Sequence, residues 1–375
     1  MKTKTLGLVI GIAALSIGAA YIAFLRGSST AQFVIGDPFL PELEPKAQSV
    51  DRIEIERTGK RVELVRDGGV WKLATSDSYP ARFEEVKGLV SGLTGLKTDQ
   101  KMTAKKERHG ELALAWPDTT GRGAHVRVLA GSDVVTDLIL GEERANPRAQ
   151  FVRRAADDQT WRVLGSVNAD IEPRRWVDAE LISLPNDEVK RVMMNGLEIG
   201  SENNERSRLR YFAVEKSTNV APTSFEWTPA RRETAVRQLP TWLSRLELDD
   251  VRKAKPGGVA DPAISPEFDM IRGTLKVKAV RDGDAVWISF EAAPKEGAPS
   301  ADKINERRKY PGDPYIPDWK AFNEKHAGWE YKLPNWKLNP LEEANKVPAD
   351  KQLTPPSTGN DVDLSIPVQI PPAGK

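Results

Sequence analysis

Hydrophobic and polar residues alternate in short segments along much of the chain. The sequence Ile-Glu-Ile-Glu at 53–56 has the period of two that is typical of a strand with one buried face. An Asp-Gly-Gly turn at 67–69 separates two further segments of this kind and predicts a β-hairpin. More strand pairs are predicted at 126–140 and at 151–164, each with turn-forming residues in the middle.

Residues 82–96 have a different period. Their hydrophobic residues are spaced by three and four positions and therefore share one face of a predicted helix: Phe83, Val86, Val90, Leu93 and Leu96. Strands around one amphipathic helix predict an α+β fold, in which a mainly antiparallel sheet is covered by a helix on one face.

The start of this helix occurs twice. Tyr-Pro-Ala-Arg at 79–82 has a counterpart in Thr-Pro-Ala-Arg at 228–231, about 150 residues later. The second copy opens another predicted helix, which extends to Leu246 and should be kinked at Pro240. A fixed offset between similar segments is typical of an internal repeat.

Strands flank the second helix in the same order as the first. A strand is predicted before it at 189–192, and a hairpin is predicted after it at 275–290. An insertion from about 294 to 328 then interrupts the repeat. We therefore predict two tandem repeated α+β units, 49–185 and 186–347, the second of which carries the insertion.

The N-terminus holds the longest apolar segment. Lys2 and Lys4 precede an apolar run at 6–25, whose length of about 20 residues suits a membrane-spanning helix. Only Arg26 follows it closely, so the positive-inside rule places the N-terminus in the cytoplasm. We predict a single-pass anchor at 1–26 in the inner (cytoplasmic) membrane, with the body of the protein in the periplasm.

A cleaved signal peptide is the alternative for this segment, because Ser-Thr-Ala at 29–31 has the small residues of a cleavage site. The apolar run exceeds the roughly 7–15 residues of a usual signal peptide, which favours the anchor. Residues 27–48 contain three prolines and are predicted to be a tether. Residues 348–375 are rich in proline and predict an extended tail.

The composition limits the functional classes. The 375 residues carry a net charge of +1, which gives no overall field to attract nucleic acid. There is no cysteine, which excludes disulfides, thiolate nucleophiles and cysteine-ligated zinc. The sequence has no phosphate-binding loop, no nucleophile elbow and no paired metal-binding histidines. We therefore expect no catalytic residues, metal or cofactor, and interpret His109, His125 and His326 as surface residues.

The insertion is the most suggestive segment for function. Four aromatic residues lie there among prolines and lysines: Tyr310, Tyr315, Trp319 and Phe322. Aromatic residues on a long polar loop are typical anchors for a protein partner. The alternative, which we favour, is that they fold back onto the sheet of the second unit, and burial of all four rings would exclude docking.

Several segments of the first unit share the pattern of a known family. They are residues 53–57, 64–73 with an Asp-Gly-Gly-Val-Trp turn, 83–96, 138–142, 151–153, 161–164 and the closing Trp-Val-Asp-Ala-Glu-Leu at 176–181. With them the chain resembles the DUF4340 family, a domain of unknown function. The resemblance covers most of residues 50–185, and the second unit matches more loosely.

The resemblance implies an N-terminal transmembrane helix, an exported body and a place beside ABC transporters of the gliding-motility type. It implies no active-site residues. We expect a non-enzymatic accessory subunit whose partner is the ABC permease or an extracytoplasmic auxiliary subunit, with no nucleic acid involved. A stand-alone envelope module that binds a glycan or lipid between the two units is the second hypothesis. An envelope hydrolase is the weakest, because adjacent carboxylates do not supply the separation that glycan hydrolysis requires.

Overall fold

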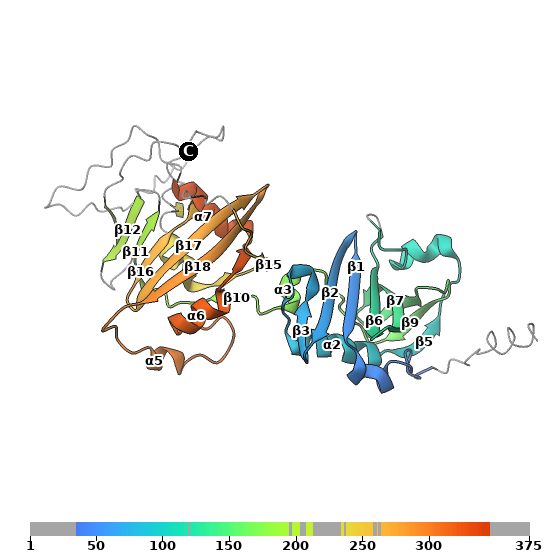
Figure 1. The fold of residues 1–375 in the computed structure, drawn as a ribbon. Helices are drawn as coiled ribbons and strands as arrows, with labels where there is room; N and C mark the ends of the chain where they lie inside the picture. Colours follow the sequence, from blue (N-terminus) through green and yellow to red (C-terminus); the bar gives the residue numbers. More distant parts are fainter. Residues whose placement is uncertain are drawn as a thin grey trace, which may run out of the picture. The chain divides into compact units, whose positions relative to one another are not determined.

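The computed structural model describes residues 35–118, 121–194, 197–202, 208–212, 234–235, 238–257, 261 and 264–345 (Figure 1). The chain divides into two compact units, one of residues 1–60 and 87–169 and one of residues 61–86 and 170–375. Both contain mainly antiparallel sheets with few helices, which confirms the predicted α+β class.

The first unit is built on an antiparallel sheet with the strand order β1-β6-β7-β8-β9-β5. Its strands are β1 (Arg52–Arg57), β5 (Lys97–Lys101), β6 (Ala124–Ala130), β7 (Asp133–Arg144), β8 (Ala149–Arg154) and β9 (Thr160–Leu164). The β6–β7 and β8–β9 pairs confirm the strand pairs predicted at 126–140 and 151–164. Two 3-10 helices, η1 (Glu44–Ser49) and η3 (Lys106–Leu112), belong to the same unit.

Part of the segment predicted as a tether packs into the first unit. Phe39, Leu40 and Leu43 are buried, and the Phe39 N–H donates to the carbonyl of Leu96 at 2.8 Å. Pro38 forms an isolated bridge with Lys97 at the start of β5. The chain therefore joins the fold of this unit before β1.

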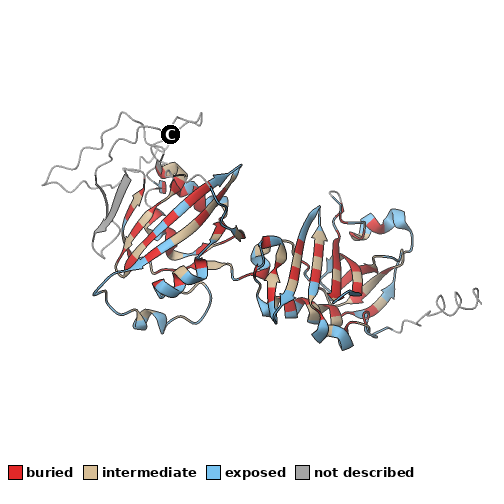
Figure 2. Ribbon diagram, in the orientation of Figure 1, coloured by how far each residue is buried: buried red, intermediate tan, exposed pale blue. Residues whose placement is uncertain are grey.

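The second unit has an antiparallel sheet with the strand order β13-β12-β11-β16-β17-β18-β19-β15. Its strands are β11 (Val189–Met194), β12 (Leu197–Glu202), β13 (Arg208–Phe212), β15 (Asp250–Lys253), β16 (Glu267–Met270), β17 (Gly273–Asp282), β18 (Ala285–Pro294) and β19 (Trp329–Lys332). Buried and exposed residues alternate along β17, as a sheet with one buried face requires (Figure 2).

Smaller elements complete the second unit. β2 (Lys60–Asp67), β3 (Val70–Leu73) and β4 (Tyr79–Pro80) pair in sequence, and β10 (Glu180–Ile182) pairs with β14 (Leu246–Glu247). The helices are η2 (Ala74–Ser76), α3 (Pro173–Trp176), η4 (Leu239–Ser244), α5 (Asp302–Asn305), α6 (Trp319–His326) and α7 (Asn335–Asn345). Gly68 and Gly69 take positive φ in the β2–β3 turn, as predicted for that hairpin.

Two helical predictions have different outcomes. α2 (Phe83–Thr94) confirms the helix predicted at 82–96, although Phe83 is exposed and Leu89 is buried in the apolar stripe instead. The second predicted helix, at 229–246, lies partly outside the described residues. Its described residues 234, 235 and 238 are α-helical, and the 3-10 helix η4 follows directly with Pro240 in its first turn, where the missing N–H is tolerated.

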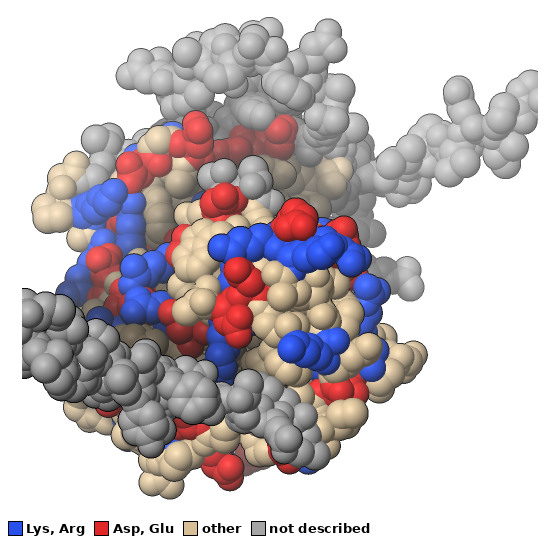
Figure 3. Space-filling model, turned by 90° about the vertical axis from the view of Figure 1, so that its right-hand side faces the viewer, with Lys and Arg blue, Asp and Glu red and all other residues tan. Residues whose placement is uncertain are grey.

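Within the described residues, no helix is long and apolar enough to span a membrane. The predicted anchor at 1–26 and the predicted tail at 348–375 lie outside the described residues. Lys and Arg side chains are mixed with Asp and Glu on the face shown in Figure 3. Charged side chains of the described residues form ion pairs, such as Arg108 with Glu111 at 3.0 Å and Arg154 with Glu42 at 2.6 Å.

Candidate functional site

The insertion that the sequence singles out connects β18 to β19. It contains α5 and α6 and lies beside the sheet formed by β17 and β18 (Figure 1). α6 begins after Asp318, whose carboxylate accepts the N–H of Ala321 at 2.9 Å and so satisfies an unpaired N–H of the first turn. The insertion is therefore a folded part of the second unit.

Aromatic packing holds α6 against β18. Trp319 and Phe322 are buried, and the Phe322 ring lies 5.7 Å from Phe290 of β18 in an edge-to-face arrangement. The side-chain amide of Asn323 donates to the carbonyl of Ala292 at 2.7 Å and accepts its N–H at 2.9 Å. These two predicted docking aromatics therefore fold back onto the sheet.

A buried ion pair fixes the start of the insertion. Glu188 is fully buried and pairs with Arg272, whose Nε also donates to the carbonyl of Pro299 at 3.0 Å. Trp319 donates its indole N–H to the carbonyl of Arg272 at 3.2 Å. Burial raises the pKa of Glu188, and Arg272 opposes that rise. The pair therefore connects β17, the loop that precedes α5, and α6.

A polar groove of about 380 Å³ lies between the insertion and the segment that leads into β10. Six side chains line it: Asp178, Glu180, Asn305, Arg308, Tyr315 and Lys325. Lys325 pairs with Asp178 at 3.0 Å and Arg308 with Glu180 at 2.6 Å. The guanidinium of Arg308 also stacks 3.9 Å from the centre of the Tyr315 ring.

The electrostatics of this groove hold it together. Burial opposes a charged Lys325, but the hydrogen bond and charge of Asp178 outweigh it and raise the pKa of Lys325. Burial, together with the charge of Glu180, raises the pKa of Tyr315. At neutral pH the lysine is therefore charged and the phenol protonated. The groove has the chemistry of a structural contact between the insertion and β10.

Tyr310 is the predicted docking residue whose side chain remains exposed to solvent. Its side chain is 69% exposed, at the tip of a turn formed by residues 309–313. The Asp313 carboxylate accepts the N–H groups of Lys309 and Tyr310, both at 2.9 Å, and these bonds lower the pKa of Asp313. Gly312 has a φ of 89° and donates its N–H to Glu180. The turn is thus fixed to the unit while the Tyr310 ring faces solvent.

All three histidines are buried, so their interpretation as surface residues is wrong. Nε2 of His125 lies 2.6 Å from Asp137, and Nε2 of His109 donates to the carbonyl of Asp158 at 2.9 Å. Nδ1 of His326 lies 2.7 Å from the Tyr331 hydroxyl. Burial lowers the pKa of His326 to about 4. Across the described part of the chain, no group of three His, Asp or Glu residues is arranged to hold a metal ion.

The two acidic residues that line the groove, Asp178 and Glu180, were not predicted from the sequence. Asp178 and Glu180 belong to the closing segment at 176–181, where alternation places every second residue on the same side of an extended chain. The sequence contains two acidic residues in this segment and basic residues in the insertion that could pair with them. It does not show that the two segments lie close together in the fold.

A family model described as "Domain of unknown function (DUF4340)" matches residues 71–263. This match begins in β3 and ends before β16, so it omits residues 50–70 of the region on which the sequence resemblance rests, extends past residue 185 and excludes the insertion. No curated protein and no solved structure matches the chain. Because the matched region is just over half of its length, the chain belongs to the DUF4340 family.

Proposed function

We propose that this protein is a non-enzymatic, membrane-anchored subunit that docks outside the cytoplasm onto a protein of an ABC-type transporter or motility complex. The observation that carries this proposal is the turn at 309–313, which presents Tyr310 to solvent from a fixed backbone. The permease or an extracytoplasmic auxiliary subunit is the proposed partner, and the apolar run at 6–25 is the proposed anchor.

The turn has the properties of a docking element. Tyrosine is enriched among the residues that dominate binding energy in protein interfaces. Because Asp313 and Glu180 already fix the backbone of the turn, binding requires little further ordering. Arg307 and Lys309 are exposed beside Tyr310, so the turn favours a partner surface with acidic residues around an apolar pocket.

We also propose that the two sheets arose by duplication, as the repeated helix start predicts. The order β1-β6-β7-β8-β9-β5 and the order β11-β16-β17-β18-β19-β15 follow the same path when the strands of each run are numbered along the chain. This correspondence sets β17 and β18 against β7 and β8, whereas the offset of about 150 residues sets them against β6 and β7. The sheet order supports duplication with the hairpins shifted by one strand.

Site-specific crosslinking tests the docking proposal. A photoreactive amino acid replaces Tyr310 in the full chain within its native membrane, and a second variant carries it at Trp336, which is exposed on α7. We expect a crosslink from position 310, and not from position 336, to a permease or auxiliary subunit of an ABC system. Recovery of the protein alone from both variants, and from gentle detergent extraction, contradicts the proposal.

A further inference from the structure

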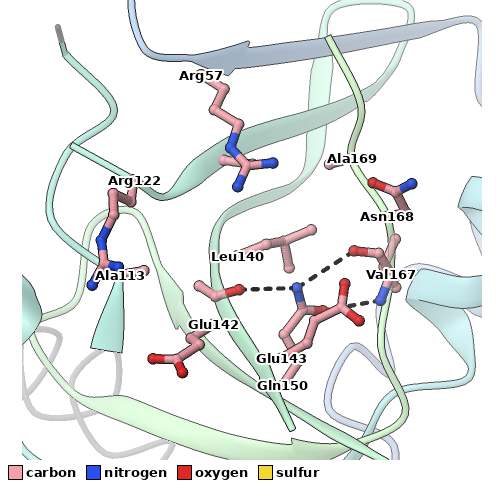
Figure 4. A pocket seen from close by; sticks show the side chains of 12 residues that line it. Arg57, Ala113, Arg122, Leu140, Glu142, Glu143, Gln150, Val167, Asn168 and Ala169 are labelled. Atoms are coloured by element: carbon pink, nitrogen blue, oxygen red, sulfur yellow. Dashed lines mark hydrogen bonds between the residues drawn. The ribbon is translucent and has the colours of Figure 1, made fainter. Parts of the chain in front are cut away.

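A cavity of about 250 Å³ lies in the first unit, far in sequence from the insertion (Figure 4). It is bordered by the end of β1, the segment before β6, the last part of β7, the start of β8 and residues 167–169. Its polar side chains are Arg57, Arg122, Glu142, Glu143, Gln150 and Asn168. The inserted turn plays no part in it, so it is independent of the docking proposal.

Hydrogen bonds of the buried Gln150 side chain hold one wall of the cavity together. The β7–β8 register shifts between Leu140 and Glu143, so β7 carries a bulge at this point. Gln150 is 3% exposed and donates to the carbonyls of Gly141 at 3.2 Å and Val167 at 3.4 Å. Its side-chain oxygen accepts the N–H of Val167 at 3.0 Å, and Figure 4 shows these bonds across the wall. The buried amide thus fixes the bulge and the 167–169 segment together.

Three charged side chains of the cavity lack partners. Within the part of the chain that the structure describes, Arg57, Arg122 and Glu143 make neither an ion pair nor a hydrogen bond through their side chains. Glu142, in contrast, pairs with Arg144 at 3.4 Å. Other arginines of the same unit are paired: Arg127 with Glu54, Arg154 with Glu42 and Arg162 with Asp99.

The unpaired charges lie on different sides of the cavity. Figure 4 shows Arg57 reaching in from the β1 side, whereas Glu143 and Gln150 lie on the opposite wall. Arg57 and Arg122 offer guanidinium groups, which bind carboxylate or phosphate through two parallel hydrogen bonds. Glu143 offers an acceptor for an ammonium group. These three residues are exposed, and opposite charges that lie apart without pairing match a ligand that carries both signs.

We propose that this cavity binds a small zwitterion, with its phosphate or carboxylate group between Arg57 and Arg122 and its ammonium group at Glu143. The volume fits such a molecule, since it equals the share of about eight water molecules at roughly 30 Å³ each. O-phosphoethanolamine and small amino acids have this size and charge pattern. The ligand is either free in solution or the headgroup of a lipid.

Calorimetric titration of the detergent-solubilised full chain tests the proposal. The probes are O-phosphoethanolamine, glycine, inorganic phosphate and ethanolamine. We expect O-phosphoethanolamine or glycine to bind at least about tenfold more tightly than phosphate or ethanolamine, because only a zwitterion uses both sides of the cavity. Equal affinity for phosphate and O-phosphoethanolamine overturns the role of Glu143, and absence of binding by both zwitterions overturns the site.

Three variants locate the binding. The double variant Arg57→Ala/Arg122→Ala should lower zwitterion affinity at least about tenfold. Glu143→Gln should lower zwitterion affinity and leave phosphate affinity unchanged. Arg108→Ala, at an exposed arginine of the same unit that does not line the cavity, is the matched control and should change neither. Unchanged affinity in the double variant, with an unchanged melting temperature, overturns the proposal.

The source of the zwitterion is distinguished in lipid nanodiscs. O-phosphoethanolamine is titrated into the full chain in phosphatidylcholine nanodiscs with and without phosphatidylethanolamine. Loss of its binding in the presence of phosphatidylethanolamine supports the site with a lipid headgroup as ligand. Unchanged binding supports the site with a free small molecule.

Discussion

Six strands in each sheet follow the same order, but different segments of the chain cover the two sheets. In the first unit, Leu112 and Leu114 pack on Ile139 of β7 and Phe151 of β8, so the cover precedes β6. In the second unit, Trp319 and Phe322 of α6 are buried beside β18, so the cover follows that strand. A sheet with this strand order can therefore be covered by the segment before or the segment after its central strands, provided that apolar side chains of that segment reach the sheet.

Similar contacts hold the two covering segments, which we call covers, against their sheets. A glycine lies beneath each, because a Cβ at Gly141 would meet the Leu112 carbonyl at 2.3 Å and one at Gly273 would meet the Trp319 indole nitrogen at 2.7 Å. An arginine also binds each cover through its backbone carbonyls, and it is buried in the first unit and partly buried in the second. Arg153 donates to the carbonyl of Leu114 at 2.9 Å, and Arg272 donates to that of Pro299 at 3.0 Å.

The arginines differ in their countercharge. Arg272 is paired with the buried carboxylate of Glu188, whereas Arg153 donates to the backbone carbonyls of residues 114, 154, 155 and 157. Burial lowers the pKa of Arg153, although nearby acidic groups oppose that change. The second unit therefore contains a buried carboxylate that depends on its arginine, whereas Arg153 has no carboxylate hydrogen-bonded to it among the described residues. This difference predicts unequal consequences when each arginine is removed.

Arg272→Met should have the largest effect. It leaves the Glu188 carboxylate buried without its partner, and loss of one member of a buried pair costs about 3–5 kcal/mol. Urea denaturation followed by circular dichroism measures this loss. The double variant Arg272→Met/Glu188→Gln should recover part of the stability, because a neutral amide needs less compensation than a carboxylate. A loss below about 1 kcal/mol in the single variant contradicts the assigned dependence.

The second prediction concerns pH and the aromatic cluster under α6. The pKa of His326 is lowered from 6.5 to about 4, first by burial and then by the charge of Lys325, while Asp178 opposes the shift. Between these two pH values, His326 binds a proton in the unfolded chain but not in the folded chain. Stability should therefore fall as the pH falls from about 6.5 to about 4, by on the order of 3 kcal/mol.

Denaturation of the wild-type protein and of His326→Gln at several pH values isolates this contribution. Other acidic groups titrate in both proteins, so the difference between their slopes reports His326. We expect a shallower pH dependence in His326→Gln, even though loss of the contact with Tyr331 lowers its stability at neutral pH. Parallel slopes for the two proteins contradict the prediction.

The sequence predicted those elements that depend on local patterns. The β2–β3 hairpin follows from Asp67, Gly68 and Gly69, and α2 follows from hydrophobic residues three and four positions apart. Exposure of Phe83 was missed because position on a helical face does not show how far the covering layer extends. The second predicted helix changes from α-helix at residue 238 to the 3-10 helix η4 next to Pro240, which lacks a backbone donor.

The candidate site was predictable only in part. The pattern identified the insertion, but it did not separate the buried rings of Trp319 and Phe322 from exposed Tyr310, since all three lie among polar residues. Burial of His125 and His326 depends on Asp137 and Tyr331, which tertiary packing brings to them. The choice of cover for each sheet likewise arises from contacts between segments distant in sequence.

The third prediction tests the arginine of the first unit. Arg153→Met should cost about 1–3 kcal/mol, less than Arg272→Met, because it leaves carbonyl groups unpaired but no isolated carboxylate. Amide hydrogen exchange should become faster in residues 102–118, which Arg153 binds through the Leu114 carbonyl. Arg144→Met is the matched control, since Arg144 is exposed, and it should cost less than about 0.5 kcal/mol. Equal losses in the two variants contradict the role of Arg153.

The smallest effect on stability is expected at the exposed tip of the second cover. Tyr310→Ala should change the free energy of unfolding by less than about 0.5 kcal/mol, because the ring is 69% exposed and the turn is held by Asp313. Trp336→Ala, at an equally exposed aromatic residue on α7, is the matched control. Both variants should melt like the wild type, but only Tyr310→Ala should reduce recovery of the partner subunit in quantitative affinity purification. Equal recovery of the partner with both variants contradicts the docking role of Tyr310. The insertion would then serve only to pack on the sheet.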